Sequence, residues 1–306
     1  MITSSTKLTS QDVAAHYDEL DPFYRDLWGE HVHHGLWLTG RETPEHAVEQ
    51  LVTHVVDALG LSDSAEVCDV GCGYGGTSRY LAFTRNAQVT GLTVSPTQYS
   101  LALEKNEGRE NPTYRLEDWQ TNGLDSDAFD GLVSIECIAH VEEKQLFFDQ
   151  VHRVLRPGKR AVITAWLSKE RPGGWETKHL LEPICREGRL LGMGTELEYT
   201  ALIERAGLRL VEYDDLSDKV SKTWSVITRR VLWALLTSPK VWRFLLLRES
   251  SHSIFMLTVA RLVAAFRTGA MRYGFFIMEK PAQSSSGLRC EASQFPASTA
   301  QVDAVN

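Results

Sequence analysis

Residues 67–81 read VCDVGCGYGGTSRYL. An apolar run at 66–70 comes first, and a helical pattern follows the glycines. Between them, Gly71, Gly73 and Gly76 match the pattern G-x-G-x-x-G. Glycines at this spacing allow a tight turn and let the backbone approach a nucleotide-type ligand at the start of a helix. The stretch therefore predicts a strand–loop–helix unit of an α/β fold, with a ligand at the loop.

Two further residues help to choose the ligand, because nicotinamide dehydrogenases show the same glycine pattern. Asp69 stands two residues before Gly71. A carboxylate there is unfavourable beside a pyrophosphate, but it suits a ligand that carries an ammonium and a sulfonium group. Dinucleotide-binding proteins place an acid about twenty residues further on to bind the ribose diol, and this chain has Thr93 there. Both residues favour the sulfonium ligand over a dinucleotide. A glycine turn without any ligand is the remaining alternative.

Outward from the glycine loop, extended and helical patterns alternate. Expected strands cover 66–70, 88–94, 111–116, 128–135, 160–166, 208–213 and 273–279. Expected helices cover 10–30, 44–60, 77–84, 96–107, 143–155 and 196–207. This alternation is typical of a Rossmann-like fold, a mostly parallel seven-stranded sheet with helices on both faces.

The alternation ends after residue 213, where a long helical stretch precedes the last expected strand. It predicts a helical cap inserted before that strand. The expected units are an N-terminal helix and active-site lid at 1–43, a Rossmann-like ligand-binding unit at 44–213, a helical cap or substrate-binding insertion at 214–272, the last strand at 273–280 and a disordered tail at 281–306. The tail is rich in Ser, Ala and Gln, which cannot bury enough apolar surface to fold.

Composition limits the possible partners. The formal net charge of −8 over 306 residues argues against nucleic acid as the main partner, because phosphate binding needs a basic surface. Five scattered cysteines form no disulfide framework or zinc site. The polar N-terminus lacks the apolar stretch of a signal peptide, so we expect a cytoplasmic protein.

One segment, 222–272, has a different character. It holds nine basic residues and one acidic residue and is rich in tryptophan, leucine and phenylalanine. Its apolar runs are shorter than the ~20 residues that span a bilayer. We therefore expect amphipathic helices, which cover the core, line an apolar pocket or make peripheral contact with a membrane surface.

Several stretches of the chain resemble a known family. The glycine loop DVGCGYGGTSRYL, followed by GLTVSPTQ, is similar to class I S-adenosylmethionine-dependent methyltransferases that act on lipids and prenylated rings, including sterol and cyclopropane-forming enzymes. Within this class the γ-tocopherol methyltransferase branch is the nearest resemblance. It rests on HYDELDPFYRDLWGEHVHHGLW at 16–37, LLEPICR at 180–186, TWSVITRRVLW at 223–233 and RYGFFIMEKP at 272–281. The resemblance covers about residues 10–281.

The resemblance implies an S-adenosylmethionine-dependent methyltransferase with a small lipophilic acceptor. A prenylated phenol or quinol, or a related natural product, is favoured, with methylation at carbon. Sterol or prenyl alkene C-methylation and N- or O-methylation of a small secondary metabolite are the alternatives. A protein that binds the cofactor without catalysis, or a nicotinamide oxidoreductase, would be a different class of function.

A cofactor site follows from the same resemblance. It comprises Asp69, Gly71, Gly73, Gly75, Thr93, Gln98, Asp118, Trp119 and Ile135. Asp69 and the glycines would hold the methionine part. Thr93 and Gln98 would contact the ribose in place of the usual acid. Asp118 and Trp119 would contact the adenine, by a hydrogen bond and by stacking. A solvated turn acid and a core tryptophan are the alternative roles of this last pair.

The candidate catalytic segment is SIECIAHVEE at 134–143, directly after the fourth expected strand. Ligands of open α/β sheets lie at the carboxyl ends of strands. Relatives often show Glu-x-x-Glu-His here; this chain has Glu136 and His140 but Ala139 in place of the second glutamate. His140 is the expected base because its reference pKa of ~6.5 lies near neutrality. Glu136 would share this role or hold the cofactor ammonium. A histidine hydrogen-bonded to backbone is the alternative for His140.

Aromatic and histidine side chains are expected to form the lid and contact the substrate. They are Tyr17, Trp28, His33, His34, Trp37 and Trp224. For an alkene acceptor, aromatic faces, with Tyr24 among them, would stabilise a carbocation instead. His31, His33 and His34 also permit a metal hypothesis. No cysteine or carboxylate set accompanies them, however, so no metal is predicted.

Overall fold

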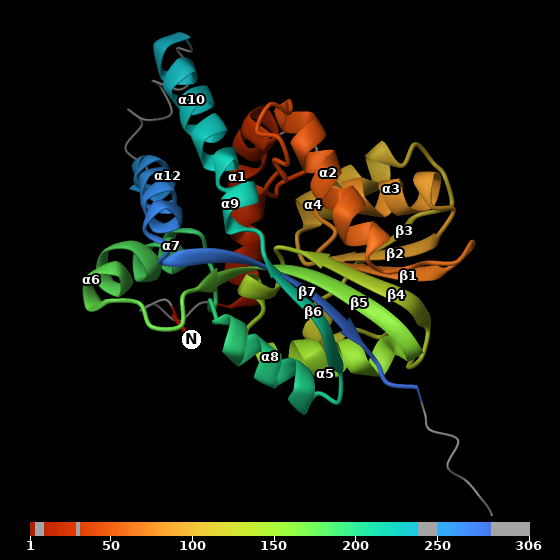
Figure 1. Ribbon diagram of the computed structural model, residues 1–306. Coiled ribbons are helices and arrows are strands. Elements are labelled where there is room, and N and C mark those ends of the chain that lie inside the picture. The colour runs from red at the N-terminus through yellow and green to blue at the C-terminus, as the bar shows by residue number, and fades with distance from the viewer. Residues whose placement is uncertain (4–8, 29–30, 238–249, 283–306) are drawn as a thin grey trace, which may run out of the picture.

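The computed structural model describes residues 1–3, 9–28, 31–237 and 250–282. Its strands are β1 (Glu66–Val70), β2 (Gln88–Thr93), β3 (Thr113–Leu116), β4 (Phe129–Ile135), β5 (Leu155–Ser168), β6 (Arg209–Asp215) and β7 (Met271–Glu279). They form one seven-stranded sheet in the order β3-β2-β1-β4-β5-β7-β6 (Figure 1). β1 to β5 pair in parallel, and β7 runs antiparallel to both β5 and β6. The predicted mostly parallel, seven-stranded Rossmann-like sheet is confirmed.

Helices connect these strands. They are α1 (Ser10–Trp28), α2 (Pro44–Asp57), α3 (Gly76–Thr84), α4 (Pro96–Lys105), α5 (Lys144–Val154), α6 (Gly174–Glu176), α7 (Glu182–Glu187), α8 (Glu196–Arg205), α9 (Ser217–Val220), α10 (Lys222–Thr237) and α12 (Ser250–Thr268). Short turns of helix add η1 (Trp119–Thr121), η2 (Ile138–His140) and η3 (Thr177–Leu181). Thr43, Ser95 and Thr195 each accept a hydrogen bond from a backbone N–H of the first turn that follows. Such caps explain why these helices begin where they do.

The core lies on both faces of the sheet. Successive residues of β7 point to opposite faces, as strand geometry requires, so Phe275 belongs to the apolar cluster that includes α2 and α3, and Phe276 belongs to the cluster that includes α5 and α8. Figure 1 shows these two pairs of helices on opposite sides of the sheet. A third apolar cluster joins α7, α10 and α12.

Two strands are longer than the sequence pattern indicates. β5 begins at Leu155 instead of residue 160, and β7 begins at Met271 instead of residue 273. Residues 156–159 (Arg-Pro-Gly-Lys) have the composition of a turn. They are nevertheless part of β5, because Leu155 already pairs with Phe129 of β4, and the register shifts before the next pair, which includes Gly131. The added residues of β7 pair with the end of β5 at Ser168. Both differences arise from partner strands, which a local pattern does not contain.

Helices fill the described part of the stretch between β6 and β7. These are α9, α10 and α12, so the helical character of this stretch agrees with the sequence pattern. Residues 238–249, with Trp242 and Phe244, and the side chain of Phe255 lie outside the described residues. The tail from residue 283 also lies outside them. None of the helices in the described ranges is long and apolar enough to cross a membrane.

Candidate active site

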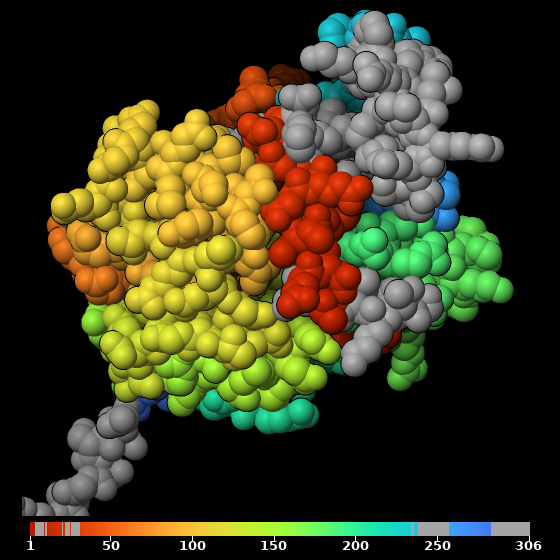
Figure 2. Space-filling view, turned by 180° about the vertical axis from the view of Figure 1, so that it is seen from behind, coloured from red at the N-terminus to blue at the C-terminus, as the bar shows by residue number. Residues whose placement is uncertain are grey.

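A cavity of about 540 Å³ opens at the carboxyl ends of the central strands. The glycine loop and the ends of β1, β2 and β4 line one half. α1, α7, α12 and the start of α10 line the other. In Figure 2, α1 (red) lies across the surface between the orange and yellow first half of the chain and the green segment that holds α7. This is the edge at which α/β sheets bind ligands.

The glycine loop adopts a left-handed backbone that only glycine accepts easily. Gly71 has φ +76° and Gly73 has φ +54°. A Cβ at Gly71 would lie 2.5 Å from Cys137 Sγ, whereas a Cβ at Gly73 would have no atom within 4 Å. Gly73 therefore keeps cavity space open, and Gly71 permits close packing. Gly75 lies against the ring of Tyr114 and is not among the residues that line the cavity; its contact with the cofactor stays a prediction.

Asp69 carries a buried carboxylate at the end of β1. It is 2% exposed and accepts a hydrogen bond of 2.6 Å from Ser78 Oγ. Burial raises the pKa of this carboxyl to about 6, and the hydrogen bonds from Ser78 act in the opposite direction. Among the residues that the structure describes, no cationic side chain pairs with it. A carboxylate on the cavity wall without a counter-ion suits a ligand with a positive charge.

The other residues of the predicted cofactor set lie at the same end of the cavity. Thr93 Oγ1 donates a 2.9 Å hydrogen bond to Gln98 Oε1, and both side chains are buried. Asp118 accepts from the backbone of η1. The indole N–H of Trp119 donates to Phe147 O at 3.1 Å. All four residues line the cavity, together with Ile135. The structure therefore brings these residues together.

Two acids hold α1 over the cavity. Asp21 is buried and accepts a 2.7 Å hydrogen bond from the Tyr74 hydroxyl of the glycine loop. Asp18 accepts a 2.5 Å hydrogen bond from Ser95 Oγ, the N-cap of α4. These contacts attach α1 to both loops that follow the first two strands.

Both ring nitrogens of His140 have a hydrogen-bond partner. Its Nδ1 lies 3.1 Å from Arg189 O, and a carbonyl only accepts, so Nδ1 carries the proton. In the neutral ring Nε2 is then an acceptor, and the Tyr17 hydroxyl lies 3.1 Å from it. Burial lowers the pKa of His140 to about 4. This pKa lies below the reference value of ~6.5 from which the expected base role was argued.

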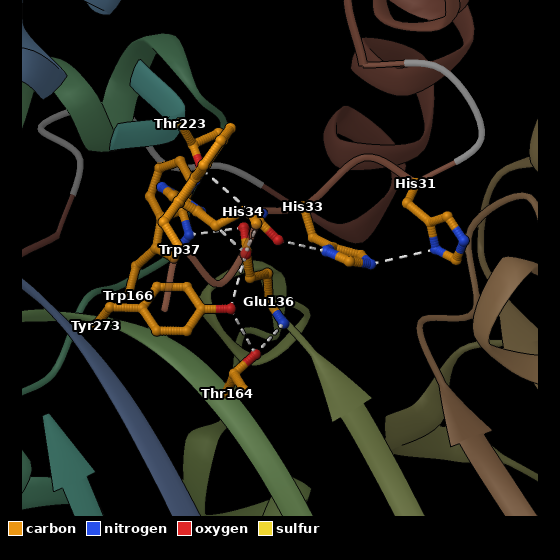
Figure 3. Close-up of polar contacts among 10 residues, drawn as sticks. His31, His33, His34, Trp37, Glu136, Thr164, Trp166, Thr223 and Tyr273 are labelled. Carbon is orange, nitrogen blue, oxygen red and sulfur yellow. Dashed lines mark hydrogen bonds and ion pairs between the residues drawn. The ribbon is translucent and has the colours of Figure 1, made fainter. Parts of the chain in front are cut away.

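Glu136 connects four segments of the chain (Figure 3). Its Oε1 accepts from the backbone N–H of His34 at 2.8 Å, from His34 Nδ1 at 2.9 Å and from the Tyr273 hydroxyl at 2.8 Å. Its Oε2 accepts from the Trp166 indole at 2.8 Å. Burial alone would raise the pKa of Glu136, but the charge and hydrogen bonds of His34 lower it to about 2. This carboxylate is saturated by protein donors, so it is placed to position residues 31–37 against β5 and β7.

The neighbouring histidines form a chain of hydrogen bonds. His33 Nδ1 lies 2.8 Å from the carbonyl of His34, and His33 Nε2 lies 3.2 Å from His31 Nδ1. His33 and His34 both line the cavity. Burial lowers the pKa of His31 to about 3 and also lowers the pKa of His33, so the imidazole of His31 is uncharged at pH 7. No cluster of three or more potential metal ligands occurs in the described parts of the chain.

The three tryptophans that were predicted to contact the substrate lie in different places. Trp224 is 5% exposed and lines the cavity. Trp37 does not line the cavity; it packs against Val226 and donates to Thr223 Oγ1 at 3.0 Å. The structure therefore places this ring against α10 and not with the cavity-lining residues, and its substrate contact stays a prediction. The side chain of Trp28, like that of Tyr24, lies outside the described residues.

Sequence reasoning missed most of the second half of the cavity. Apolar side chains from α1, α7, α12 and the turn after α7 line it: Val13, Ile184, Leu190, Val259 and Leu262. Arg186, Glu187 and Arg189 add charge at this end, and Glu187 is paired with Arg261 of α12. Two sequence signals pointed to this half without naming these residues: the stretch LLEPICR at 180–186, as part of the family resemblance, and the expected substrate-binding insertion at 214–272.

Comparisons with known proteins agree with this geometry. A family model described as mycolic acid cyclopropane synthetase matches residues 4–270. The chloroplastic tocopherol O-methyltransferase of Arabidopsis thaliana is 26% identical, over 91% of this chain and 84% of the relative. Two solved structures are similar in fold. One is the cyclopropane synthase MmaA2 of Mycobacterium tuberculosis, with a TM-score of 0.79 and 20% identity over 90% of this chain and 100% of that chain. The other is geranyl diphosphate C-methyltransferase of Streptomyces coelicolor in complex with Mg²⁺, geranyl diphosphate and S-adenosyl-L-homocysteine, with a TM-score of 0.66 and 17% identity over 89% and 98%.

Proposed function

The chain belongs to the mycolic acid cyclopropane synthetase family and is an S-adenosylmethionine-dependent methyltransferase, and we propose that its acceptor is a small lipophilic prenylated phenol or quinol. The observation that supports this acceptor is the contrast between the two halves of the cavity. The half at the glycine loop is polar, with the buried carboxylate of Asp69. The half at α7 and α12 is largely apolar.

The polar half fits the cofactor. S-adenosylmethionine supplies a methyl group that is activated by a sulfonium charge, and it carries an ammonium group. The open space at Gly73 leaves room for such a ligand, and the carboxylate of Asp69, which pairs with no cationic side chain of the described ranges, suits its charge. We assign the methionine part to Asp69 and the glycines, the ribose to Thr93 and Gln98, and the adenine to Asp118 and Trp119.

The apolar half fits a lipophilic acceptor. Trp224 of α10 and Leu262 of α12 line it, which supports residues 214–272 as an acceptor-binding cap. The geranyl diphosphate methyltransferase binds a prenyl chain in a similar fold. Burial of each CH₂ of such a chain contributes about 0.8 kcal/mol.

The Tyr17–His140 pair supports an acceptor with an acidic proton. The hydroxyl of Tyr17 contacts the unprotonated nitrogen of a neutral histidine. A proton leaving the acceptor hydroxyl can therefore pass to Tyr17 while that of Tyr17 passes to His140. Deprotonation activates the hydroxyl oxygen and also the ring carbons beside it. We retain a ring carbon as the proposed accepting atom.

Labelled methyl transfer tests this function. Purified protein is incubated with methyl-labelled S-adenosylmethionine and three acceptor sets: prenylated phenols and quinols, sterols with an alkene side chain, and unsaturated fatty acyl lipids. We expect label in the first set, and fragmentation should place it on the ring. Label confined to the alkene sets would reject the proposed acceptor. Label on the oxygen of a phenol or quinol would reject only the proposed accepting atom, the ring carbon, and would leave the acceptor class in place.

The protonation of Asp69 predicts how cofactor affinity depends on pH. The pKa is raised to about 6, so the uncharged form dominates below that value and cannot hold an ammonium group. Affinity should rise with pH through about 6 and then level off. Calorimetry with S-adenosylhomocysteine should show binding about tenfold weaker at pH 5 than at pH 7. Asp69→Asn should bind weakly with no such dependence; an equal dependence in this variant would assign the titration to another group.

We further propose that one face of α10 contacts a membrane surface. Leu232, Trp233 and Leu236 are 52%, 69% and 84% exposed, and the exposed Arg229 lies one turn before them on the same face. An apolar stripe next to a basic residue is typical of helices that lie in the headgroup region of anionic bilayers.

Liposome co-sedimentation tests this face. Trp233→Ser with Leu236→Ser should reduce binding to vesicles with anionic lipid about tenfold, because two large apolar side chains no longer insert. Trp175→Ser is the matched control, since Trp175 is 62% exposed on α6, away from this face. Equal losses in both proteins, or no binding by the unmodified chain, would argue against the contact.

A further inference from the structure

The side chain of Lys144 is buried behind the wall of the cavity. Lys144 is the first residue of α5 and is 5% exposed. Residues 139–141 line the cavity, whereas Lys144 does not. Its side chain reaches back from the helix to η2, the turn that carries His140. Lys144 is therefore not placed to touch a ligand, and it can act on the site only through this turn.

The terminal nitrogen of Lys144 binds the backbone on both sides of His140. Nζ donates to Ala139 O at 3.3 Å, and it makes a second hydrogen bond to Val141 O. These carbonyls belong to the residues directly before and after His140. A donor that bonds to both carbonyls keeps the three residues in one arrangement, because a movement of the backbone at His140 would break at least one contact.

The ring of His140 is held by other segments of the chain. Its Nδ1 donates to Arg189 O at 3.1 Å, and its Nε2 lies 3.1 Å from the Tyr17 hydroxyl. Both contacts need the ring in one place, and a shift of the backbone that carries the ring moves it away from them. The two hydrogen bonds of Lys144 therefore set how well Nε2 faces Tyr17.

Burial makes this arrangement costly in free energy. Loss of water around the side-chain nitrogen lowers the pKa of Lys144 to about 7, so amine and ammonium forms coexist at pH 7. Both forms carry N–H donors, and each can bond to the two carbonyls. An apolar side chain of the same length would avoid the cost of desolvation. This cost indicates that the two contacts contribute to the geometry of the turn more than to the stability of the fold.

We propose that Lys144 is a positioning residue for proton removal, which fixes the turn at residues 138–140 so that His140 Nε2 meets the Tyr17 hydroxyl. This inference rests on the proposed function, in which the acceptor proton passes to Tyr17 and that of Tyr17 to His140. No atom of Lys144 takes part in this transfer. Without its two hydrogen bonds the turn has more than one arrangement, and the pair is aligned in only a fraction of them. Proton removal then slows, while cofactor binding is kept.

Two substitutions and one control separate this role from packing. Lys144→Met keeps the unbranched chain and removes every N–H donor of the side chain. Ala139 O remains bonded to Leu191 N and Gly192 N, at 2.9 and 3.2 Å, so the turn is loosened without being unfolded. Lys144→Arg restores N–H donors and should recover part of the loss. Lys280→Met is the matched control, because the Lys280 side chain is 12% exposed and is paired with an acid outside the cavity.

Kinetics with the acceptor identified by labelled transfer tests the proposal. Lys144→Met should lower kcat about tenfold, while the acceptor KM and the affinity for S-adenosylhomocysteine stay unchanged. Calorimetry provides this affinity and checks folding in every variant. In His140→Ala, where the base is absent, adding Lys144→Met should cause no further loss of kcat, because both changes act on the same step. Lys280→Met should match the unmodified chain.

Hydrogen exchange measures the turn itself, without turnover. The amide N–H groups of His140 and Val141 bond to Cys137 O at 2.9 Å and to Ile138 O at 3.1 Å. With S-adenosylhomocysteine bound, these two amides should exchange about tenfold faster in Lys144→Met than in the unmodified chain. The amides of α3 should exchange equally in both.

The outcomes distinguish the inference from the proposed function. An equal loss of kcat from Lys144→Met in the unmodified and His140→Ala chains, or a loss mainly in cofactor affinity, would overturn the positioning role and leave the methyltransferase assignment intact. Unchanged kcat in Lys144→Met would also overturn it. Label in none of the acceptor sets would reject the proposed acceptor class. Exchange at His140 and Val141 would then decide whether Lys144 holds the turn, and unchanged exchange would reject this.

Discussion

Replacing Gly73 by valine is expected to abolish binding of S-adenosylmethionine while the chain remains folded. A side chain at this position meets no protein atom within 4 Å and projects into cavity space. It would occupy the volume that the cofactor needs, so we expect a loss of more than about 100-fold in affinity. The left-handed backbone adds strain of about 1–2 kcal/mol, which lowers stability without preventing folding. Calorimetry with S-adenosylhomocysteine measures the affinity, and thermal unfolding measures the stability.

Gly108→Val controls for this strain. Gly108 has φ +74°, also has no atom within 4 Å of an added Cβ, and does not line the cavity. This variant should lose a similar amount of stability and bind the cofactor normally. Undiminished affinity in Gly73→Val would place the cofactor away from the glycine loop.

The second large effect concerns the Tyr17–His140 pair. Tyr17→Phe and His140→Ala should each reduce kcat about 100-fold, because general base catalysis typically contributes 10²–10⁴-fold. Affinity for S-adenosylhomocysteine should change little. Steady-state kinetics with an acceptor identified by the labelled-transfer assay provides kcat, and calorimetry provides affinity.

The control and the pH profile make this prediction specific. Tyr80→Phe removes a tyrosine hydroxyl that is bonded to Thr53, outside the cavity, and should leave kcat unchanged. Because the pKa of His140 is about 4, the unprotonated ring predominates above that value, and kcat should fall only as the pH approaches it. A fall of kcat between pH 7 and 6 would point to another base, and a loss mainly in cofactor affinity would make His140 structural.

The polar half of the cavity could be predicted from the sequence because its signals are local. Asp69 and the glycines are neighbours in the chain, and the strand before them and the helix after them fix their geometry. Thr93 and Gln98 follow the next strand in the same way. The parallel pairing of β1 with β2 then brings both loops to one edge. Alternating patterns predict the two loops of this half, and the family resemblance supplies the roles expected for Thr93 and Gln98.

The sequence indicated only part of the acceptor half, through the 214–272 insertion and Trp224, because most of its residues meet only in three dimensions. Glu136 was expected as a base or an ammonium ligand, but donors from His34, Trp166 and Tyr273 saturate it. The histidine of the same segment has a pKa far from its reference value, since burial depends on α1 and the turn at Arg189. Neither effect has a local sequence signal.

The order of strands in the sheet also has a consequence for protein synthesis. β7 is the last of these seven strands along the chain and so the last of them to leave the ribosome, yet it lies between β5 and β6. It carries Tyr273, which closes the hydrogen bonds around Glu136. Until this strand inserts, β5 has an open edge and β6 has no partner strand, and Glu136 lacks the hydrogen bond from Tyr273. A chain that terminates early, before residue 271, should therefore be both aggregation-prone and inactive, so that truncated copies are recognised as unfolded rather than accumulating as defective enzyme.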